Sequence, residues 1–260
     1  MKLKIYQIDA FSDQPFSGNP AAVCPLEAWL EDGIMQSIAE ENNLSETAFF
    51  VKRNNGFHIR WFTPLTEVDL CGHATLAAAH VIFAMLRYQE NEIIFQSRSG
   101  ELIVKRNKEQ LEMNFPEQTP ELCECPQNLL KAFNSKPIAC LKAEDYILVF
   151  ESEEEVVSAQ PIYEQLTKLD LRGVIITAES TNFDFVSRFF APKYGINEDP
   201  VTGSAHTQLT PYWSKRLSKK RLHAKQVSKR GGEIFCEDKG NRVLISGNAF
   251  HVMTGELILP

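Results

Sequence analysis

Short alternating runs of apolar and polar residues dominate the chain and predict a protein rich in β-strands. Alternation over residues 56–62 ("GFHIRWF") indicates a strand buried on one face. Residues 100–115 predict a hairpin, because two alternating apolar runs flank a polar turn. Three further β-rich runs, "DYILVF", "GVIIT" and "RVLIS", stand between turn signals. The pattern therefore favours a mixed fold with many short strands and few helices.

Helical periodicity is confined to four segments, at about 31–43, 74–87, 160–169 and 204–217. The second is apolar on nearly all sides, and a helix without a polar face must be enclosed by other structure. We therefore predict that it is the central helix of a β-rich shell. The fourth contains Pro211, which should kink the helix or split off its first turn.

Two stretches of the chain nearly repeat each other. Residues 60–64 read "RWFTP" and residues 188–192 read "RFFAP"; an acidic loop follows each, and then a Gly directly before a predicted helix. The repeat predicts two α+β halves related by a pseudo-twofold axis, each with strands wrapped around one helix. A Pro- and Glu-containing patch at 116–126 is the candidate linker. We place the lobes at 1–115 and 116–249.

Length and composition fit a folded protein with a substantial core. The chain has 260 residues, of which 43% are hydrophobic. No stretch reaches the roughly 18–20 uninterrupted apolar residues that a membrane-spanning helix needs. The N-terminus lacks the apolar block of a signal peptide. We therefore expect a cytoplasmic protein that does not bind membranes.

Six cysteines show no Cys-x-x-Cys pair, and the "CEC" at 123–125 has the wrong spacing for a zinc knuckle, with no His cluster beside it. Reduced, mostly buried thiols are the favoured interpretation, and no metal site is predicted. The absence of a Gly-x-Gly-x-x-Gly motif and of a P-loop gives no support for a nucleotide cofactor.

The net charge of −7 argues against a general nucleic-acid binder. One stretch differs, because residues 215–230 hold eight Lys and Arg side chains and no acid. A solvated helix end running into a loop is the favoured explanation. The alternative is a surface that steers an anionic substrate or partner. Aromatic residues, which usually accompany single-stranded nucleic-acid binding, are missing from this run.

The two repeated glycines, Gly72 and Gly203, precede helices whose first backbone N–H groups have no partner within the helix. A helix N-terminus attracts anions, by about 0.3–1 kcal/mol when exposed and up to about 2 kcal/mol when partly buried. Two such termini facing one cleft would hold a small carboxylate. The repeat therefore predicts an active site built from both halves.

Three side chains near these helix starts could move protons. His73 follows Gly72, and Asp199 lies four residues before Gly203. Glu46 stands where a predicted helix stops and an apolar strand begins, so partial burial is expected there, which favours the protonated form of a carboxyl group. The alternative, that Ser45 and Glu46 only cap a turn, stays open on spacing alone.

A Ser-His-Asp hydrolase is a competing interpretation of the same residues. Ser204, Asp199 and either His206 or His73 could supply the three groups. However, "VTGSAH" lacks the Gly-x-Ser-x-Gly motif, and Ser204 lies at a helix start without a strand-to-helix elbow. Hydrolysis is therefore disfavoured.

Four motifs in order give the chain a resemblance to a known family. They are "SGNPAAV" (17–23), "LSETAFF" (44–50), "RWFTPLTEVDLCGHATLAAAH" (60–80) and "RFFAPKYGINEDPVTGSAHTQLTPYW" (188–213). The chain resembles the phenazine-biosynthesis F (PhzF) family over essentially its whole length. The resemblance implies a diaminopimelate-epimerase-like α+β fold: two pseudo-symmetric lobes, each a β-barrel around a central helix, with the active site between them. It also implies a C-terminal strand at about 250–260 that returns to the first lobe, a homodimer, and no cofactor.

Catalytic members of this family isomerise a dihydro-hydroxyanthranilate. By resemblance, Glu46 is the acid/base that lifts a proton from one ring carbon and returns it to another. His73, Asp199 and Ser204 match the supporting polar residues. Substrate contacts are expected from the motif residues Asn19, Ser45, Gly72, His73, Gly203 and Ser204.

Diaminopimelate epimerases and proline racemases use two facing cysteines. Cys71 falls near one of those positions, but Pro200-Val201-Thr202 in the other lobe offers no thiol. Two-thiol racemisation is therefore disfavoured, and we expect a cofactor-independent isomerase acting on a small cyclic or unsaturated carboxylate. The alternatives are a racemase or epimerase on an amino-acid-like substrate, pairing Glu46 with Asp199 or His73, and a non-catalytic carboxylate-binding protein.

Overall fold

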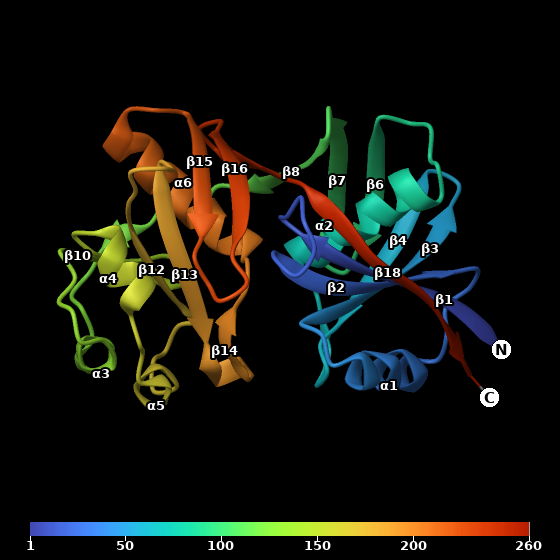
Figure 1. Ribbon diagram of the computed structural model, residues 1–260, viewed down its shortest axis with the longest axis horizontal. Helices are drawn as coiled ribbons and strands as arrows, with labels where there is room; N and C mark the ends of the chain where they lie inside the picture. Colours follow the sequence, from blue (N-terminus) through green and yellow to red (C-terminus); the bar gives the residue numbers. More distant parts are fainter. Residues whose placement is uncertain (260) are drawn as a thin grey trace. The chain divides into compact units, whose positions relative to one another are not determined.

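The computed structural model describes residues 1–259, which form two compact units (Figure 1). Unit 1 consists of Met1–Asn114 together with the C-terminal segment from Ser246 onward. Unit 2 consists of Phe115–Ile245. Each unit combines a strongly bent set of strands with a buried helix, and each is described in turn.

Unit 1 is built on β-strands, three of which are buried along most of their length. The strand β1 pairs antiparallel with both β2 and β18, so the C-terminal strand belongs to this unit. β2 pairs in parallel with β3, and β3 pairs antiparallel with β4. β7 and β8 form the hairpin predicted at 100–115. The strands are β1 (Lys2–Ala10), β2 (Asn19–Leu26), β3 (Glu46–Arg53), β4 (Gly56–Phe62), β5 (Glu67–Val68), β6 (Glu92–Ser97), β7 (Gly100–Asn107), β8 (Gln110–Pro116) and β18 (Ala249–Ile258).

The central helix of unit 1 is α2 (Gly72–His80), which packs among β1, β2 and β3 (Figure 1). Every residue from position 73 to position 79 is buried. Alanines dominate this run, and their small side chains let the strands approach the helix closely. The prediction of an enclosed helix is confirmed for its first ten residues, whereas its last turn is largely exposed. It starts two residues earlier than predicted and continues as a π-helical turn, η1 (Val81–Met85).

A second helix, α1 (Asp32–Asn42), covers the outside of the strands of unit 1. It buries Met35, Ile38 and Ala39, which share one face because they are three and four positions apart. The helix ends where Asn43 adopts a left-handed conformation with φ 48°. The predicted segment 31–43 therefore differs by one residue at each end.

Unit 2 has the same mixture of strands around a helix. β11 pairs in parallel with β12, and β13 pairs in parallel with β15 and antiparallel with β12. The strands are β9 (Glu121–Leu122), β10 (Ala139–Lys142), β11 (Tyr146–Val149), β12 (Val174–Glu179), β13 (Phe185–Ala191), β14 (Ile196–Asp199), β15 (Arg221–Gln226), β16 (Gly232–Asp238) and β17 (Arg242–Gly247).

Short helices flank these strands: α3 (Gln127–Ala132), α4 (Glu153–Ser158), α5 (Tyr163–Leu166) and a 3-10 turn, η2 (Pro192–Tyr194). The helix predicted at 160–169 is reduced to the four residues of α5, so most of that prediction is wrong. The longer helix α4 lies upstream, where Ser152 and Glu155 form a capping box. This capping signal is visible in the sequence, but the apolar positions of α4 are too few to mark it.

The buried helix of unit 2 is α6 (Gly203–Leu217), which runs unbroken through Pro211. Pro211 has no N–H, so the carbonyl of Thr207 one turn earlier loses its usual donor. The backbone N–H of Gln118 donates to that carbonyl at 3.2 Å instead. The prediction that the proline splits off the first turn is wrong, because a segment from elsewhere in the unit supplies the missing hydrogen bond.

The repeated Arg has the same structural role in both units. Arg60 on β4 forms a two-pronged ion pair with Glu67 on β5, with N–O distances of 2.7 and 2.8 Å. Arg188 on β13 pairs in the same way with Glu198 on β14, at 2.6 and 3.0 Å. Each guanidinium also stacks on the Phe two positions further along its strand, at 5.2 and 5.1 Å. The first part of the repeat therefore ties each strand to the short strand that follows it.

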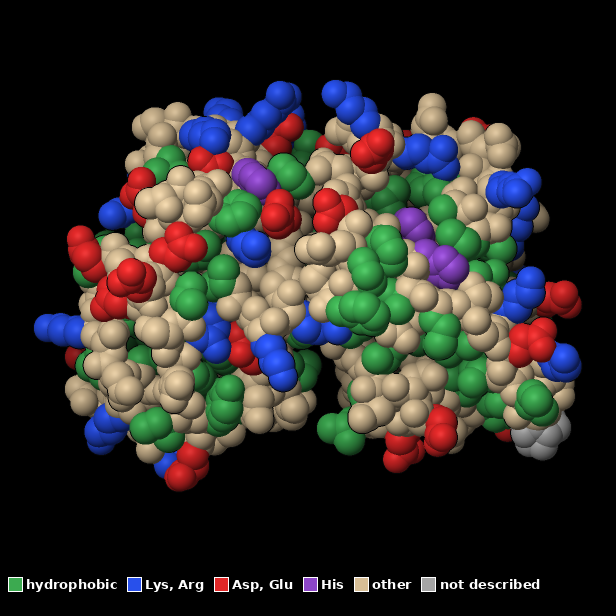
Figure 2. All heavy atoms as spheres, in the orientation of Figure 1, with side chains coloured by type: hydrophobic (Ala, Val, Ile, Leu, Met, Phe, Trp, Pro, Cys, Tyr) green, Lys and Arg blue, Asp and Glu red, His purple; other side chains and the backbone are tan. Residues whose placement is uncertain are grey.

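Positive and negative side chains are interspersed on the face that Figure 2 shows. Within the basic stretch 215–230, Lys219 pairs with Asp184 at 2.6 Å and Arg221 with Glu237 at 3.3 Å. The helix end of the prediction is confirmed, because α6 ends at Leu217, but the loop is wrong, because β15 occupies Arg221–Gln226. Within residues 1–259, no helix has both the length and the apolar character required to span a membrane.

Candidate active site

Glu46 is the first residue of β3 and lies opposite Ala21 of the parallel strand β2. The following strand residues up to Val51 are all buried, so the start of the strand is drawn into the core of unit 1. The Glu46 side chain is accordingly almost covered, with 9% of the residue exposed. The expectation of a partly buried acid at this position is met.

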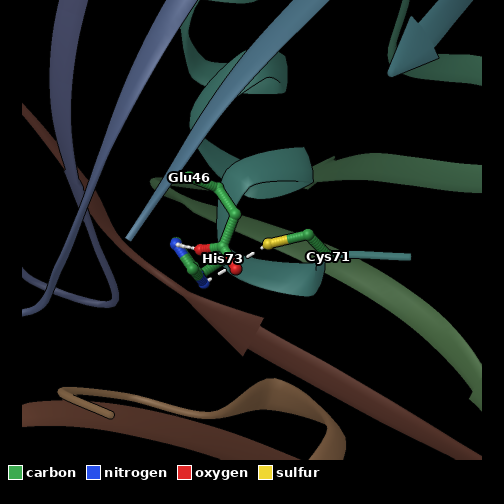
Figure 3. Close-up of side chains that lie close together, drawn as sticks. All are labelled: Glu46, Cys71 and His73. Carbon is green, nitrogen blue, oxygen red and sulfur yellow. Dashed lines mark hydrogen bonds and ion pairs between the residues drawn. The ribbon is translucent and has the colours of Figure 1, made fainter. Parts of the chain in front are cut away.

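His73 stands in the first turn of α2 and points at Glu46 (Figure 3). Its Nε2 lies 3.0 Å from Glu46 Oε2, an ion-pair distance, and 5% of the residue is exposed. The two residues come from elements that pack together, since α2 contacts β3. The structure therefore brings together two of the four residues predicted to be catalytic.

Asn19, the first residue of β2, contacts the other nitrogen of the imidazole. Its Nδ2 lies 3.2 Å from His73 Nδ1, and Asn19 is fully buried. An amide nitrogen donates, so Nδ1 accepts and a neutral imidazole carries its proton on Nε2, toward Glu46. Turning the amide over would present its oxygen and suit the doubly protonated ring. Asn19 thus orients His73 in either protonation state.

Cys71 approaches the same ring nitrogen of His73 as Asn19 does, with Sγ 3.5 Å from Nδ1 (Figure 3). Burial, followed by the neighbouring Glu46 carboxylate, raises the pKa of the Cys71 thiol. A thiol that stays protonated is a poor base. This arrangement gives Cys71 a packing role beside the pair and speaks against thiol-based proton transfer.

The pKa of His73 is raised well above its usual value. Burial opposes the charged imidazolium, but the charges of Cys71 and Glu46 and the contacts with both residues outweigh it. Among these raising contributions, that of Cys71 is larger than that of Glu46. A protonated His73 is therefore the favoured state of the ring.

Neither of the two repeated helices is capped by a side chain at its N-terminus. Cys71 precedes α2 and Thr202 precedes α6, and neither accepts a side-chain cap hydrogen bond. The first N–H groups of each helix therefore keep their capacity to donate to an anion. The prediction that both termini face one cleft concerns the placement of the two units and stays a prediction.

Asp199 ends β14 and is tied into a polar cluster of unit 2. Thr202 Oγ1 donates to Asp199 Oδ2 at 2.5 Å. The Gln226 amide donates to the Asp199 carbonyl at 2.7 Å and accepts from the Thr202 N–H at 2.9 Å. Thr202 and Gln226 were not predicted from the sequence, because 24 residues separate them and no local pattern links them.

Ser204 is the second residue of α6 and accepts from Arg172 Nη2 at 3.1 Å. Arg172 in turn forms a two-pronged pair with Asp145, at 3.0 and 2.6 Å, and Asp145 is fully buried. Gln208 of α6 also donates to Asp145, at 2.7 Å. Asp199 is among the anions that raise the pKa of Arg172, after Asp145 and Glu144. This charged network was likewise missed by sequence reasoning.

The arrangement that a Ser-His-Asp hydrolase needs is not formed in unit 2. His206 Nδ1 donates to the Thr202 carbonyl at 2.8 Å, and the ring stacks on Phe185. Burial lowers the pKa of His206 to about 4, so the ring is neutral. Ser204 bonds to Arg172 instead. Residues two apart on a helix point in different directions, which explains why Ser204 and His206 do not meet.

Three predicted contact residues complete the set. Ser45 is half-buried and directly precedes β3. Gly72 and Gly203 begin α2 and α6.

A separate cavity of about 990 Å³ lies beside α4, and none of the predicted site residues lines it. Its lining includes Glu151, Glu153 and Glu154, whose negative charge would repel a carboxylate.

Three side chains could in principle hold a metal ion, since one ligand atom each of Glu46, Cys71 and His73 lie within 4.8 Å of one another. Cys, His and carboxylate are ligands that Zn²⁺ accepts. However, the 3.0 Å between His73 Nε2 and Glu46 Oε2 is shorter than the roughly 3.3 Å that two such ligands keep around one tetrahedral ion. The geometry favours direct pairing of the two residues.

Comparison with solved structures identifies the fold. A phenazine biosynthesis PhzF-family protein of Enterococcus faecalis is similar over 100% of both chains, with TM-score 0.98 and 47% identity. A hydroxyproline epimerase of Agrobacterium vitis, 8% identical, matches 98% of this chain and 92% of its own with TM-score 0.62, which reflects the fold alone. The predicted diaminopimelate-epimerase-like α+β fold is confirmed.

Comparison with curated sequences gives the family. An uncharacterized isomerase of Pseudomonas aeruginosa is 52% identical over 259 residues, covering 100% of both chains, and one of Halalkalibacterium halodurans is 43% identical over 264 residues, again over 100% of both. These names agree with the prediction of an isomerase. A profile described as phenazine biosynthesis-like protein matches residues 8–255. The chain therefore belongs to the PhzC-PhzF family of phenazine biosynthesis-like proteins.

Proposed function

We propose that the protein is a cofactor-independent isomerase that moves a proton on a small cyclic or unsaturated carboxylate, with Glu46 as the acid and base. The observation that carries this proposal is the buried Glu46–His73 pair, with 3.0 Å between Nε2 and Oε2. A carboxylate held by one fixed partner in a nearly dry environment is suited to general acid/base chemistry. Membership in a family with relatives named isomerases supports the reaction class.

The reaction runs in two proton transfers. Ionised Glu46 removes a proton from one carbon of the substrate, so a C–H bond breaks and an O–H bond forms. The electron pair enters the conjugated system and spreads toward the substrate carboxylate. Protonated Glu46 then returns the proton to a second carbon. The double bond shifts, and no oxidant or reductant is consumed.

His73 and Asn19 act on Glu46 as positioning residues. His73 faces Oε2, which leaves Oε1 for the substrate, and Asn19 fixes the ring from its other side at 3.2 Å. An imidazolium also compensates the negative charge of Glu46 before the first transfer. A base held in one orientation gains rate because it does not have to be ordered during the reaction.

The uncapped N-terminus of α2 is proposed to bind the substrate carboxylate through the N–H groups near Gly72 and His73. Donors already in place where negative charge develops stabilise the transition state. Asp199, Ser204 and the N–H groups near Gly203 are proposed as further supporting groups, and Ser45 as a substrate contact. The homodimer expected from the resemblance stays a prediction that sedimentation in solution would test.

A panel assay in heavy water tests the proposal. Dihydro-hydroxyanthranilate, cyclohexadiene carboxylates and proline-like amino acids would each be incubated with the protein and followed by proton NMR. The proposal expects a double-bond shift on an unsaturated ring carboxylate. Inversion of a stereocentre with solvent deuterium incorporated would favour an epimerase instead. Binding of these compounds without any exchange would indicate a carboxylate-binding protein.

A further inference from the structure

Three cysteines of unit 2, Cys123, Cys125 and Cys140, lie close together and form what we call the thiol cluster. Cys123 Sγ lies 3.6 Å from Cys140 Sγ, and Cys125 also interacts with Cys140. All three are free thiols. The proposed reaction uses none of them.

The backbone holds Cys123 and Cys140 opposite each other. Leu122 of β9 pairs with Leu141 of β10 in antiparallel register, so the next positions along each strand are Cys123 and Cys140. The N–H of Cys123 donates to the Cys140 carbonyl at 3.0 Å. Opposite residues in such a pair have Cα atoms about 4.5–5.5 Å apart. That separation falls within the roughly 4.4–6.8 Å that disulfides span.

The two thiols differ in their access to solvent. Cys140 is 7% exposed, whereas Cys123 is half-buried at the surface. Burial, followed by interaction with Cys125 and Cys123, raises the pKa of Cys140 and so disfavours its thiolate. An oxidant in solution therefore reaches Cys123 before it reaches Cys140. The Cys140 sulfur lies within contact distance of the Cys123 sulfur.

We propose that Cys123 and Cys140 are a covalent modification site that closes to a reversible disulfide on exposure to a peroxide. The Cys123 thiolate attacks one peroxide oxygen, the O–O bond breaks, and a sulfenic acid and hydroxide result. The Cys140 sulfur then attacks the sulfenic sulfur, the S–S bond forms, and water leaves. In total, two thiols and one hydrogen peroxide give one disulfide and two waters.

Binding of a metal ion is less well supported for this cluster. Among residues 1–259, the group of Cys, His and acidic side chains whose ligand atoms all lie within 4.8 Å of one another is Glu46, Cys71 and His73. The three sulfurs of the thiol cluster do not meet that condition together. A disulfide, which needs only two neighbouring sulfurs, agrees better with the 3.6 Å between the sulfurs of Cys123 and Cys140.

The bond would tie β9 to β10 across the segment that contains α3. The two cysteines are 17 positions apart, and closing a loop of that size restricts the unfolded chain. We expect the thermal midpoint of the oxidised protein to rise by several degrees, reversibly with a thiol reductant.

Peptide mapping tests the proposal. The protein would be treated with hydrogen peroxide, alkylated, and digested with trypsin without reduction. Cleavage after Lys131 separates residues 109–131, with Cys123 and Cys125, from residues 132–142, with Cys140. We expect these two peptides to be joined, with fragmentation assigning the link to Cys123. Cys125→Ser should retain the link and the rise in midpoint, and Cys123→Ser should lose both.

Buried Cys24 and Cys236 are internal controls, because both should remain unmodified in the folded protein. A link that fragmentation assigns to Cys125 would overturn the proposal. So would recovery of Cys140 as a free thiol after peroxide treatment of protein that is still folded. Both outcomes can be measured on the wild-type protein, so the test does not depend on the folding of a variant.

Discussion

His73 Nε2 lies 3.0 Å from Glu46 Oε2, although 27 positions separate the two residues along the chain. One is the first residue of a strand and the other is in the first turn of the central helix. Packing of α2 against β3 is what brings them together. The proposed chemistry therefore depends on the packing of the core of unit 1. Changes to the two residues should affect the stability of the fold as well as the reaction.

The Glu46–His73 pair should make stability fall as the pH rises above 6.5. The pKa of His73 is raised in the folded state, so the folded protein holds its proton more tightly than the unfolded chain does. This stabilisation is complete below pH 6.5 and is lost as the pH passes the raised value. Urea unfolding between pH 6.5 and 9 should show this decline in the wild type. It should be absent in His73→Gln, and equal slopes in both proteins would contradict the assignment.

His206 should have the opposite effect on the acid side. Burial lowers its pKa to about 4, so the unfolded chain binds the proton more tightly and stability is lost as the pH falls from 6.5 toward 4. A difference of this size corresponds to about 3 kcal/mol. We expect His206→Gln to reduce the slope of unfolding free energy against pH in this range. An unchanged slope would show that His206 titrates normally.

The repeated Arg–Glu pairs should matter for stability in both units. Removing one partner of a largely buried ion pair leaves a charge without compensation, at a cost of about 3–5 kcal/mol. Arg188→Leu should therefore lower the unfolding free energy in urea, and Arg188→Lys should lose less because it keeps the charge. Arg60→Leu should cost less than Arg188→Leu, because Arg98 still pairs with Glu67 at 2.8 Å. If Arg188→Leu is as stable as the wild type, the structural role of the repeat is wrong.

Asp145 should be the residue on which the Arg172 network depends. It is fully buried and accepts from both Arg172 and Gln208. Asp145→Asn keeps the shape but removes the charge facing Arg172, and we expect a loss of about 3 kcal/mol. Equilibrium unfolding measures this change. Glu144→Gln is the matched control, because Glu144 pairs with the same arginine at the surface and should cost under about 1 kcal/mol.

The sequence predicted the central helix and the partly buried acid because both follow from local pattern. An all-apolar segment has to be enclosed, and an acid at the head of an apolar strand has to be partly covered. The repeat also predicted two similar halves, and in each half its Arg pairs with a Glu on the following strand. Nothing in a five-residue motif distinguishes an arginine that binds a ligand from one that pairs with a glutamate 7 or 10 positions later.

Other features lay beyond the reach of sequence reasoning. Asp145 and Gln208 are 63 positions apart, so their contact is fixed by the packing of α6 and not by any local signal. Pro211 was expected to kink its helix or split off the first turn, but the helix is continuous. The donor that satisfies the Thr207 carbonyl comes from Gln118, far upstream. Long-range hydrogen bonds of this kind override local preference and have no local signature.

The most direct test of the central claim is proton exchange by Glu46→Gln. With a substrate from the heavy-water panel, the exchange rate would be compared among the wild type, Glu46→Gln and Glu41→Gln, an exposed control on α1. The account predicts that Glu41→Gln matches the wild type. Glu46→Gln should lose a factor of about 10²–10⁴ while it still binds the compound and melts cooperatively. A folded Glu46→Gln protein that exchanges at the wild-type rate would contradict the account.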